Sequence, residues 1–121
     1  MKILNIGLFG FGCVGQGLYY VLNHSTGFKA NIKKIGVKDR NKKRIVSANM
    51  ITYDKYEILN DPEIDVVVEL IDDATEAFEI VKTAITNGKH VVTANKKMLA
   101  LHLTELFALQ EKHQVSLLYE A

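Results

Sequence analysis

Apolar residues fall into two patterns that alternate along the chain. Residues 3–9 (ILNIGLF) and 66–71 (VVVELI) are short, nearly continuous apolar runs, which are typical of strands buried on both faces of a sheet. Residues 13–23 and 74–87 instead carry their apolar residues at helical spacing. The start of the chain therefore predicts a strand followed by a helix, and the same pair recurs in its middle.

The remaining segments continue this alternation. Further elements are predicted as strands over residues 32–37, 51–53, 90–93 and 115–119, a helical turn over 55–60, and a helix, in one piece or two, over 96–113. The charged segment 38–44 is expected to be a loop that enters a short helix. Asp73 with Glu76 three residues later resembles a capping box, and Asn87-Gly88 is a natural helix stop.

Strands separated by crossover helices predict a parallel sheet covered by helices on both faces. Because such crossovers are right-handed, the expected fold class is a three-layer α/β, doubly wound sheet of the Rossmann type. A length of 121 residues suits one domain of this kind, without internal repeats. Since the chain stops after a predicted strand without a closing helix, we expect residues 1–121 to be one domain of a longer protein.

Composition narrows the function classes. Apolar residues make up 48% and charged residues 24%, the balance of a soluble globular protein. A formal charge of +1 gives no field that would attract nucleic acid, and no apolar run has membrane-spanning length. The single cysteine, Cys13, excludes an internal disulfide, and no signal peptide is visible. We therefore expect a cytoplasmic protein with neither a nucleic-acid nor a membrane partner.

A glycine-rich motif joins the first predicted strand to the first predicted helix. It matches G-x-G-x-x-G and consists of Gly10, Phe11, Gly12, Cys13, Val14 and Gly15. Gly10 allows the tight turn, Gly12 leaves room for a pyrophosphate, and Gly15 lets the helix pack close to the strand. Amides at the helix start would then face the phosphates of a dinucleotide. The alternative is a glycine-rich turn without a ligand, and Cys13 is expected to serve packing.

Charged residues follow the second predicted strand, at Lys38, Asp39 and Arg40. An acid at this place usually binds the ribose hydroxyls of NAD, whereas a nearby arginine accommodates the extra phosphate of NADP. This chain offers both, within a basic cluster that suits a phosphate dianion. Lys42 and Lys43 of that cluster are better explained as a solvated loop. We expect NADP or NAD as the cofactor, with NADP favoured.

Asp72 and Asp73 follow the fourth predicted strand. Acids at this place interact favourably with the positive end of the next helix. Because a pyrophosphate would repel them, neither is expected to touch one. Their predicted role is therefore structural.

The fifth predicted strand runs into Thr93-Ala94-Asn95-Lys96-Lys97, in which Asn95 suits a helix N-cap. Lysines in a first helical turn interact unfavourably with the helix dipole, by roughly 0.3–1 kcal/mol each, so a purely structural sequence would place acids there. Lys96 or Lys97 is therefore a candidate proton donor or oxyanion stabiliser. The alternative is a surface lysine tolerated at small cost.

All these segments follow predicted strands. The carboxyl ends of parallel strands lie along one edge of a sheet, and open α/β sheets bind ligands there, where the strand order reverses. The sequence therefore predicts one site that combines the glycine motif, the charged residues after the second strand and the lysines after the fifth.

A specific resemblance appears in residues 88–100, GKHVVTANKKMLA, which are similar to the signature of homoserine dehydrogenases. Residues 7–18, GLFGFGCVGQGL, resemble the cofactor loop of that family, and VVVEL at 66–70 also fits. Residues 117–121, LLYEA, resemble the segment that leads into the substrate domain of the family. The resemblance covers essentially the whole chain in order.

The resemblance implies reversible reduction of L-aspartate 4-semialdehyde to L-homoserine with NAD(P)H. It implies that Lys96 takes part in proton transfer and that Thr93, Ala94 and Asn95 line the nicotinamide end. It further implies that Glu120 contributes to a monovalent-cation site in some members. The longer protein would be a homodimer whose second domain binds the small-molecule substrate, and this chain alone would bind cofactor at best.

Two departures from the family and two rival interpretations remain. The family continues past YEA into a glycine-rich segment and a larger domain, which residues 1–121 do not include. The family usually has two glycines where this chain has Asp72-Asp73, which puts a cofactor contact there in doubt. Another amino-acid dehydrogenase, such as an aspartate dehydrogenase, could share this first domain, although the lysine-bearing TANK segment argues against it. A non-catalytic dinucleotide sensor, like the ligand-gating domains of potassium channels, would not need lysines after the fifth strand.

Overall fold

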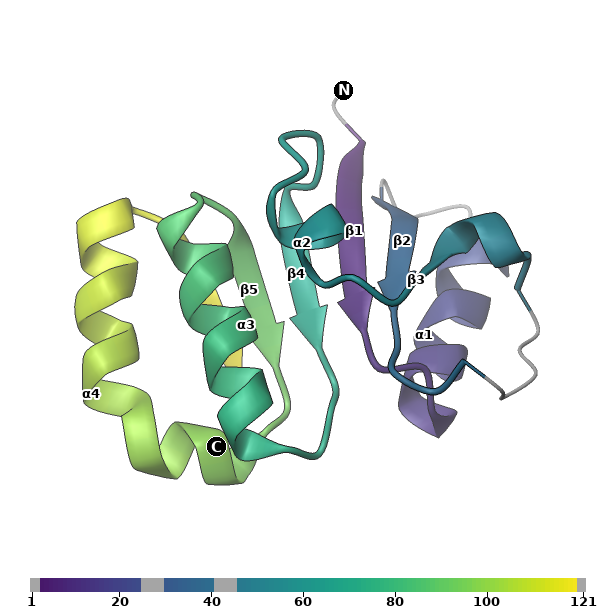
Figure 1. Cartoon of the computed structure of the whole chain (residues 1–121). Coiled ribbons are helices and arrows are strands. Elements are labelled where there is room, and N and C mark those ends of the chain that lie inside the picture. The colour runs from purple at the N-terminus through teal and green to yellow at the C-terminus, as the bar shows by residue number, and fades with distance from the viewer. Residues whose placement is uncertain (1–2, 25–29, 41–45, 120–121) are drawn as a thin grey trace.

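The computed structural model describes residues 3–24, 30–40 and 46–119, which form a central parallel sheet between two layers of helices (Figure 1). In chain order the elements are β1 (Leu4–Phe9), α1 (Cys13–His24), β2 (Ala30–Gly36), the 3-10 helix η1 (Ala48–Met50), β3 (Ile51–Thr52), α2 (Tyr56–Leu59), β4 (Val66–Glu69), α3 (Ala74–Thr86), β5 (His90–Thr93), α4 (Lys96–His113) and β6 (Leu117–Tyr119). The strand order is β3-β2-β1-β4-β5-β6, so the order reverses between β1 and β4. The doubly wound fold that the sequence predicts is confirmed.

Side chains of the strands alternate between two apolar cores, one on each face of the sheet. Leu8 and Val68 pack with α1, whereas Phe9 and Val67 pack with α2, α3 and α4. This two-sided burial explains why β1 and β4 are apolar at nearly every position. Helix α1 therefore covers one face of the sheet, and α2, α3 and α4 cover the other (Figure 1).

The last residues of all six strands stand in register. Thr52 pairs with Gly36, Gly36 with Phe9, Phe9 with Glu69, Glu69 with Thr93, and Thr93 with Tyr119. The loops that leave these strands consequently begin along one edge of the sheet. The sequence-based expectation that the candidate segments share an edge is confirmed.

Several predicted boundaries are wrong. The strand predicted over 115–119 begins only at Leu117, because Gln114 adopts a left-handed conformation (φ 53°) and the Val115 N–H still donates to the Gln110 carbonyl. The strand predicted over 66–71 ends at Glu69. In contrast, the helix predicted over 96–113 has the predicted bounds, and it forms as one piece.

The predicted start of α3 is confirmed in part. The Asp73 carboxylate accepts hydrogen bonds from the backbone N–H groups of Thr75 and Glu76, so Asp73 is the N-cap. The Glu76 carboxylate does not complete a capping box, since it pairs with Lys55 Nζ at 3.3 Å. Gly88 follows the end of α3 with φ +80°, as the Asn87-Gly88 stop predicts.

Candidate dinucleotide-binding site

The loop between β1 and α1 leaves an open surface at the centre of the sheet edge. Gly10 turns the chain with φ +92°, and its N–H donates to the Gly36 carbonyl at 3.0 Å. A Cβ built on Gly12 would have no heavy atom within 4 Å, so Gly12 faces open space. A Cβ on Gly15 would lie 2.7 Å from the Gly10 carbonyl oxygen. The close approach that Gly15 permits is therefore to the loop itself rather than to the body of the strand.

The other motif residues have different surroundings. Phe11 is buried, and its ring meets the Tyr19 ring edge-on with centroids 5.9 Å apart, so it serves the core beneath α1. Val14 is 70% exposed on the first turn of α1. Cys13 opens α1, and its side chain lies outside the described part of the structure. The first helical turn offers backbone N–H groups without intrahelical acceptors, a ready site for an anion.

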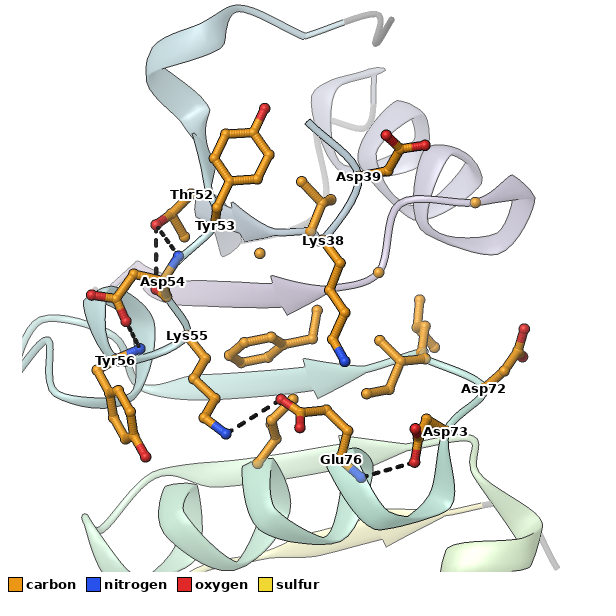
Figure 2. A pocket seen from close by; sticks show the side chains of 18 residues that line it. Lys38, Asp39, Thr52, Tyr53, Asp54, Lys55, Tyr56, Asp72, Asp73 and Glu76 are labelled. Carbon is orange, nitrogen blue, oxygen red and sulfur yellow. Dashed lines mark hydrogen bonds and ion pairs between the residues drawn. The ribbon is translucent and has the colours of Figure 1, made fainter. Parts of the chain in front are cut away.

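A cleft of about 710 Å³ opens beside this loop (Figure 2). Its walls come from the ends of β1 and β2 and from the loops after β3 and β4, together with α3. The lining residues are Phe9, Gly10, Gly12, Gly36, Val37, Lys38, Asp39, Thr52, Tyr53, Asp54, Lys55, Tyr56, Leu70, Ile71, Asp72, Asp73, Glu76 and Ile80. This volume is within the range of small-molecule and cofactor sites.

The charged residues after β2 lie at the cleft. Lys38 extends across it toward the first turn of α3, where Asp73 and Glu76 lie, whereas Asp39 points away from α3 (Figure 2). The Arg40 guanidinium lies 4.3 Å from the centroid of the Tyr53 ring, a cation–π contact. Tyr53 itself lines the cleft, so its ring holds Arg40 beside the opening. Lys42 and Lys43 lie outside the described residues.

The two acids after β4 differ in their surroundings. Hydrogen bonds from the backbone N–H groups of Glu76 and Thr75 lower the pKa of Asp73, and the positive charges of Lys38 and Lys97 add to that effect. The predicted helix-capping role is confirmed for Asp73. Asp72 is exposed at the cleft wall.

The sequence reasoning missed Glu69, the last residue of β4. Its carboxylate is fully buried and accepts two hydrogen bonds, from the Thr93 hydroxyl at 2.5 Å and from the Ile71 N–H at 2.7 Å. Burial raises the pKa of Glu69, although the Thr93 and Ile71 hydrogen bonds oppose that shift. A lone acid inside the apolar run VVVELI was the available signal, because burial of an unpaired carboxyl group is unfavourable.

The segment after β5 lies one strand further along the edge and does not line the cleft. Asn95 is the N-cap of α4, as predicted, since its Oδ1 accepts the Met98 N–H at 2.9 Å. Its Nδ2 donates to the carbonyl oxygens of Ile71 at 3.1 Å and Asp72 at 3.5 Å. These bonds attach the start of α4 to the loop after β4, and Lys96 follows as the exposed first residue of that helix.

The Thr93 side chain points inward, where its hydroxyl also accepts the Asn95 N–H at 3.2 Å. Ala94 is exposed beside it, and its N–H donates to the Glu69 carbonyl at 3.3 Å. Glu120 lies outside the described residues. Among residues 3–24, 30–40 and 46–119, no group of three or more His, Cys, Asp or Glu side chains is placed to hold a metal ion. Within the same ranges, no helix is both long and apolar enough to cross a membrane.

A six-stranded doubly wound sheet with a glycine loop at its switch point defines the class of Rossmann-type dinucleotide-binding domains. Residues 10–120 match the family model described as homoserine dehydrogenase, NAD binding domain. The chain belongs to this family. Neither rival raised by the sequence, an aspartate dehydrogenase or a dinucleotide sensor, is favoured by the comparisons.

Similar proteins agree with this assignment. Homoserine dehydrogenases of Pseudomonas aeruginosa and Bacillus subtilis are 41% and 35% identical to the chain, and each match covers 100% of the chain and 30% of the relative. The crystal structure of S. aureus homoserine dehydrogenase at pH 6.0 superposes with a TM-score of 0.88 at 40% identity, covering 100% of this chain and 34% of that one. The Thiobacillus denitrificans enzyme gives a TM-score of 0.88 at 35% identity, covering 99% and 30%. The chain therefore spans about a third of the length of these proteins.

Proposed function

We propose that this chain is the NAD(P)-binding domain of an enzyme that interconverts L-homoserine and L-aspartate 4-semialdehyde, and that a further domain of a longer protein binds the substrate. The observation that carries the proposal is the arrangement of the strand ends. The cleft, with the open Gly12 surface in its wall, and the Asn95–Lys96 junction lie along one edge of the sheet.

The residues of this edge fit a dinucleotide. The space beside Gly12 that a side chain would fill admits a pyrophosphate, and the N–H groups of the first turn of α1 would hold it. The cleft, with Lys38 and Asp39 in its wall, would take the adenosine end. Bound there, NAD(P) would supply hydride transfer to or from the substrate carbon.

Lys96 supplies the proton chemistry in this proposal. As the exposed first residue of α4, it lies at the same edge as the glycine loop, with its backbone position fixed by the Asn95 cap. Its ammonium group would donate a proton to the aldehyde oxygen as homoserine forms, and its amine would accept that proton in the reverse direction. Thr93, Ala94 and Asn95 would form the wall at the nicotinamide end.

We propose NADP as the preferred cofactor. Lys38 and Arg40 provide two cations next to the cleft, and the stacking of Arg40 on Tyr53 orients its guanidinium before any ligand arrives. Asp39 would bind the ribose hydroxyls of NAD, so NAD binding is also expected.

The remaining proposals rest on the family resemblance. They are a contribution of Glu120 to a monovalent-cation site and a homodimer of the longer protein. A cytoplasmic location is proposed on a different ground, because a single cysteine suits a reducing compartment. No nucleic-acid or membrane partner is proposed.

Replacement of Lys96 tests the proposed function. In the full-length dehydrogenase, Lys96→Ala should lower kcat by a factor on the order of 100 or more, because a positioned general acid contributes about 10²–10⁴-fold. NADPH affinity should stay unchanged, since the amine acts on the substrate. The measurement is steady-state aldehyde reduction together with an NADPH fluorescence titration.

Lys97→Ala is the matched control, because Lys97 is the adjacent exposed lysine in the same helical turn. It should retain most of the turnover. Near-normal turnover of Lys96→Ala would remove Lys96 from the mechanism, and a wild-type enzyme inactive with the aldehyde would refute the proposed function itself.

A further inference from the structure

Glu69 occupies a position that stability alone does not explain. It is the last residue of β4, in the centre of the sheet, and its side chain is 0% exposed. A carboxyl group there raises the free energy of the folded state at neutral pH relative to an apolar side chain of similar size. Departures of this kind from the expected pattern are concentrated at functional sites.

Its hydrogen bonds join two of the loops at the candidate site. One carboxylate oxygen accepts the Ile71 N–H in the loop after β4, and the other accepts the Thr93 hydroxyl at the end of β5. The Thr93 hydroxyl in turn accepts the backbone N–H of Asn95, and the side-chain Nδ2 of Asn95 donates to the Ile71 carbonyl. The four residues thus form a closed ring of hydrogen bonds between the two loops.

One member of the ring, Asn95, is the residue immediately before Lys96. Asn95 is at once a member of the ring and the N-cap of α4, so any movement of Thr93 is transmitted to the start of the helix that carries Lys96. Ile71 and Asp72 on the other side of the ring line the cleft. The ring therefore couples the cleft wall to the backbone of the candidate proton donor.

We propose that Glu69 is a positioning residue, whose carboxylate acts through Thr93 and Asn95 to set Lys96 relative to the cofactor. The proposal rests on the proposed function. An apolar residue at position 69 would leave the Ile71 N–H and the Thr93 hydroxyl without this acceptor, and the two loops could then shift against each other. A misplacement of about 1 Å at a reacting group lowers rate by a factor on the order of 100.

Glu69→Gln and Thr93→Val test the proposal in the full-length enzyme. Glutamine has the size of glutamate, but its NH₂ group can only donate where a carboxylate oxygen accepted, so either the Thr93 hydroxyl or the Ile71 N–H loses its acceptor. Each variant should lower kcat about tenfold or more while NADPH affinity stays within about twofold, because the ring does not hold the phosphates. Thr93→Ser, which keeps the hydroxyl, should restore most of kcat. The double variant should be little worse than either single one, since both break one ring.

Lys89→Met is the matched structural control. Lys89 is buried immediately before β5, and its Nζ donates to the carbonyl oxygens of Asp61 and Ile64 in the segment before β4. It thus connects the same two strands at the opposite edge. Lys89→Met should lower the Tm, because it leaves two buried carbonyl groups without their donor, but it should not lower kcat at a temperature where the variant is folded.

The possible results distinguish failure of the positioning role from failure of the proposed function. Normal kcat in Glu69→Gln and Thr93→Val, with an active wild type and an inactive Lys96→Ala, would overturn the positioning role and leave the proposed function standing. An equal loss of kcat in Lys89→Met would assign the effect to stability and overturn it as well. A wild type without aldehyde reductase activity would instead reject the proposed function.

Discussion

At the scale of single residues, the chemistry of the site depends on where the charged side chains lie. Lys38 and Arg40 are both exposed cations after β2, yet Lys38 extends toward α3 whereas Arg40 stacks on Tyr53. The sequence places both at the end of a strand. It gives no indication of the Arg40–Tyr53 contact, because that contact depends on how β3 pairs with β2 and brings Tyr53 alongside.

Arg40→Ala should separate the two cofactors. The variant should lose about tenfold to 100-fold in NADPH affinity, because a hydrogen bond to a charged group contributes roughly 1.5–3 kcal/mol. Its NADH affinity should remain unchanged, since NADH carries no phosphate at that ribose. Parallel fluorescence titrations with both nucleotides measure the ratio of NADPH to NADH affinity. Equal losses of affinity for the two nucleotides would show that Arg40 does not bind the 2′-phosphate.

At the scale of elements, some glycines in the β1–α1 loop and in α1 should serve ligand binding and others the packing of the fold. A Cβ at Gly12 or Gly17 meets no heavy atom within 4 Å, whereas a Cβ at Gly15 approaches the Gly10 carbonyl to 2.7 Å. The space around these glycines therefore differs, and of the three a side chain would be excluded by the fold only at Gly15. Gly12 should serve the ligand, Gly15 the packing of α1 on the loop, and Gly17 neither.

Three substitutions test this division of roles. Gly12→Val should keep the wild-type Tm but abolish dinucleotide binding, because the added side chain occupies the phosphate position. Gly15→Ala should lower the Tm, since either α1 or the loop must shift. Gly17→Ala, the control inside the same helix, should bind normally and gain up to about 1 kcal/mol of stability. Unchanged affinity in Gly12→Val would defeat the phosphate-loop interpretation.

Element boundaries show where sequence reasoning reaches its limit. The hydrophobic pattern predicts each strand and each α-helix of the described residues, because burial on one or two faces makes the apolar residues periodic, but it does not predict the 3-10 helix η1. The end of β4 does not follow from the run VVVELI, since Ile71 is as apolar as its neighbours. The strand ends there because the Glu69 carboxylate accepts the Ile71 N–H. The same carboxylate also accepts the hydroxyl of Thr93, 24 positions away, and a contact of that range cannot be predicted from the local sequence.

At the scale of the whole molecule, the account depends on one arrangement. Six strands end in register along one edge, and the order of the strands reverses at its centre, next to Gly10. Parallel-sheet geometry makes this edge predictable from the sequence, because every candidate segment follows a strand. The size of the cleft and its separation from the Thr93–Lys96 segment required the three-dimensional structure.

Amide chemical shifts of the isotope-labelled 121-residue chain, followed during an NADPH titration, test this arrangement most directly. The account predicts saturable shifts at residues 10–15, 38–40 and 93–96, and little change at residues 61–64 and 88–90 on the opposite edge. Absence of saturable shifts, or the largest shifts at that opposite edge, would contradict it.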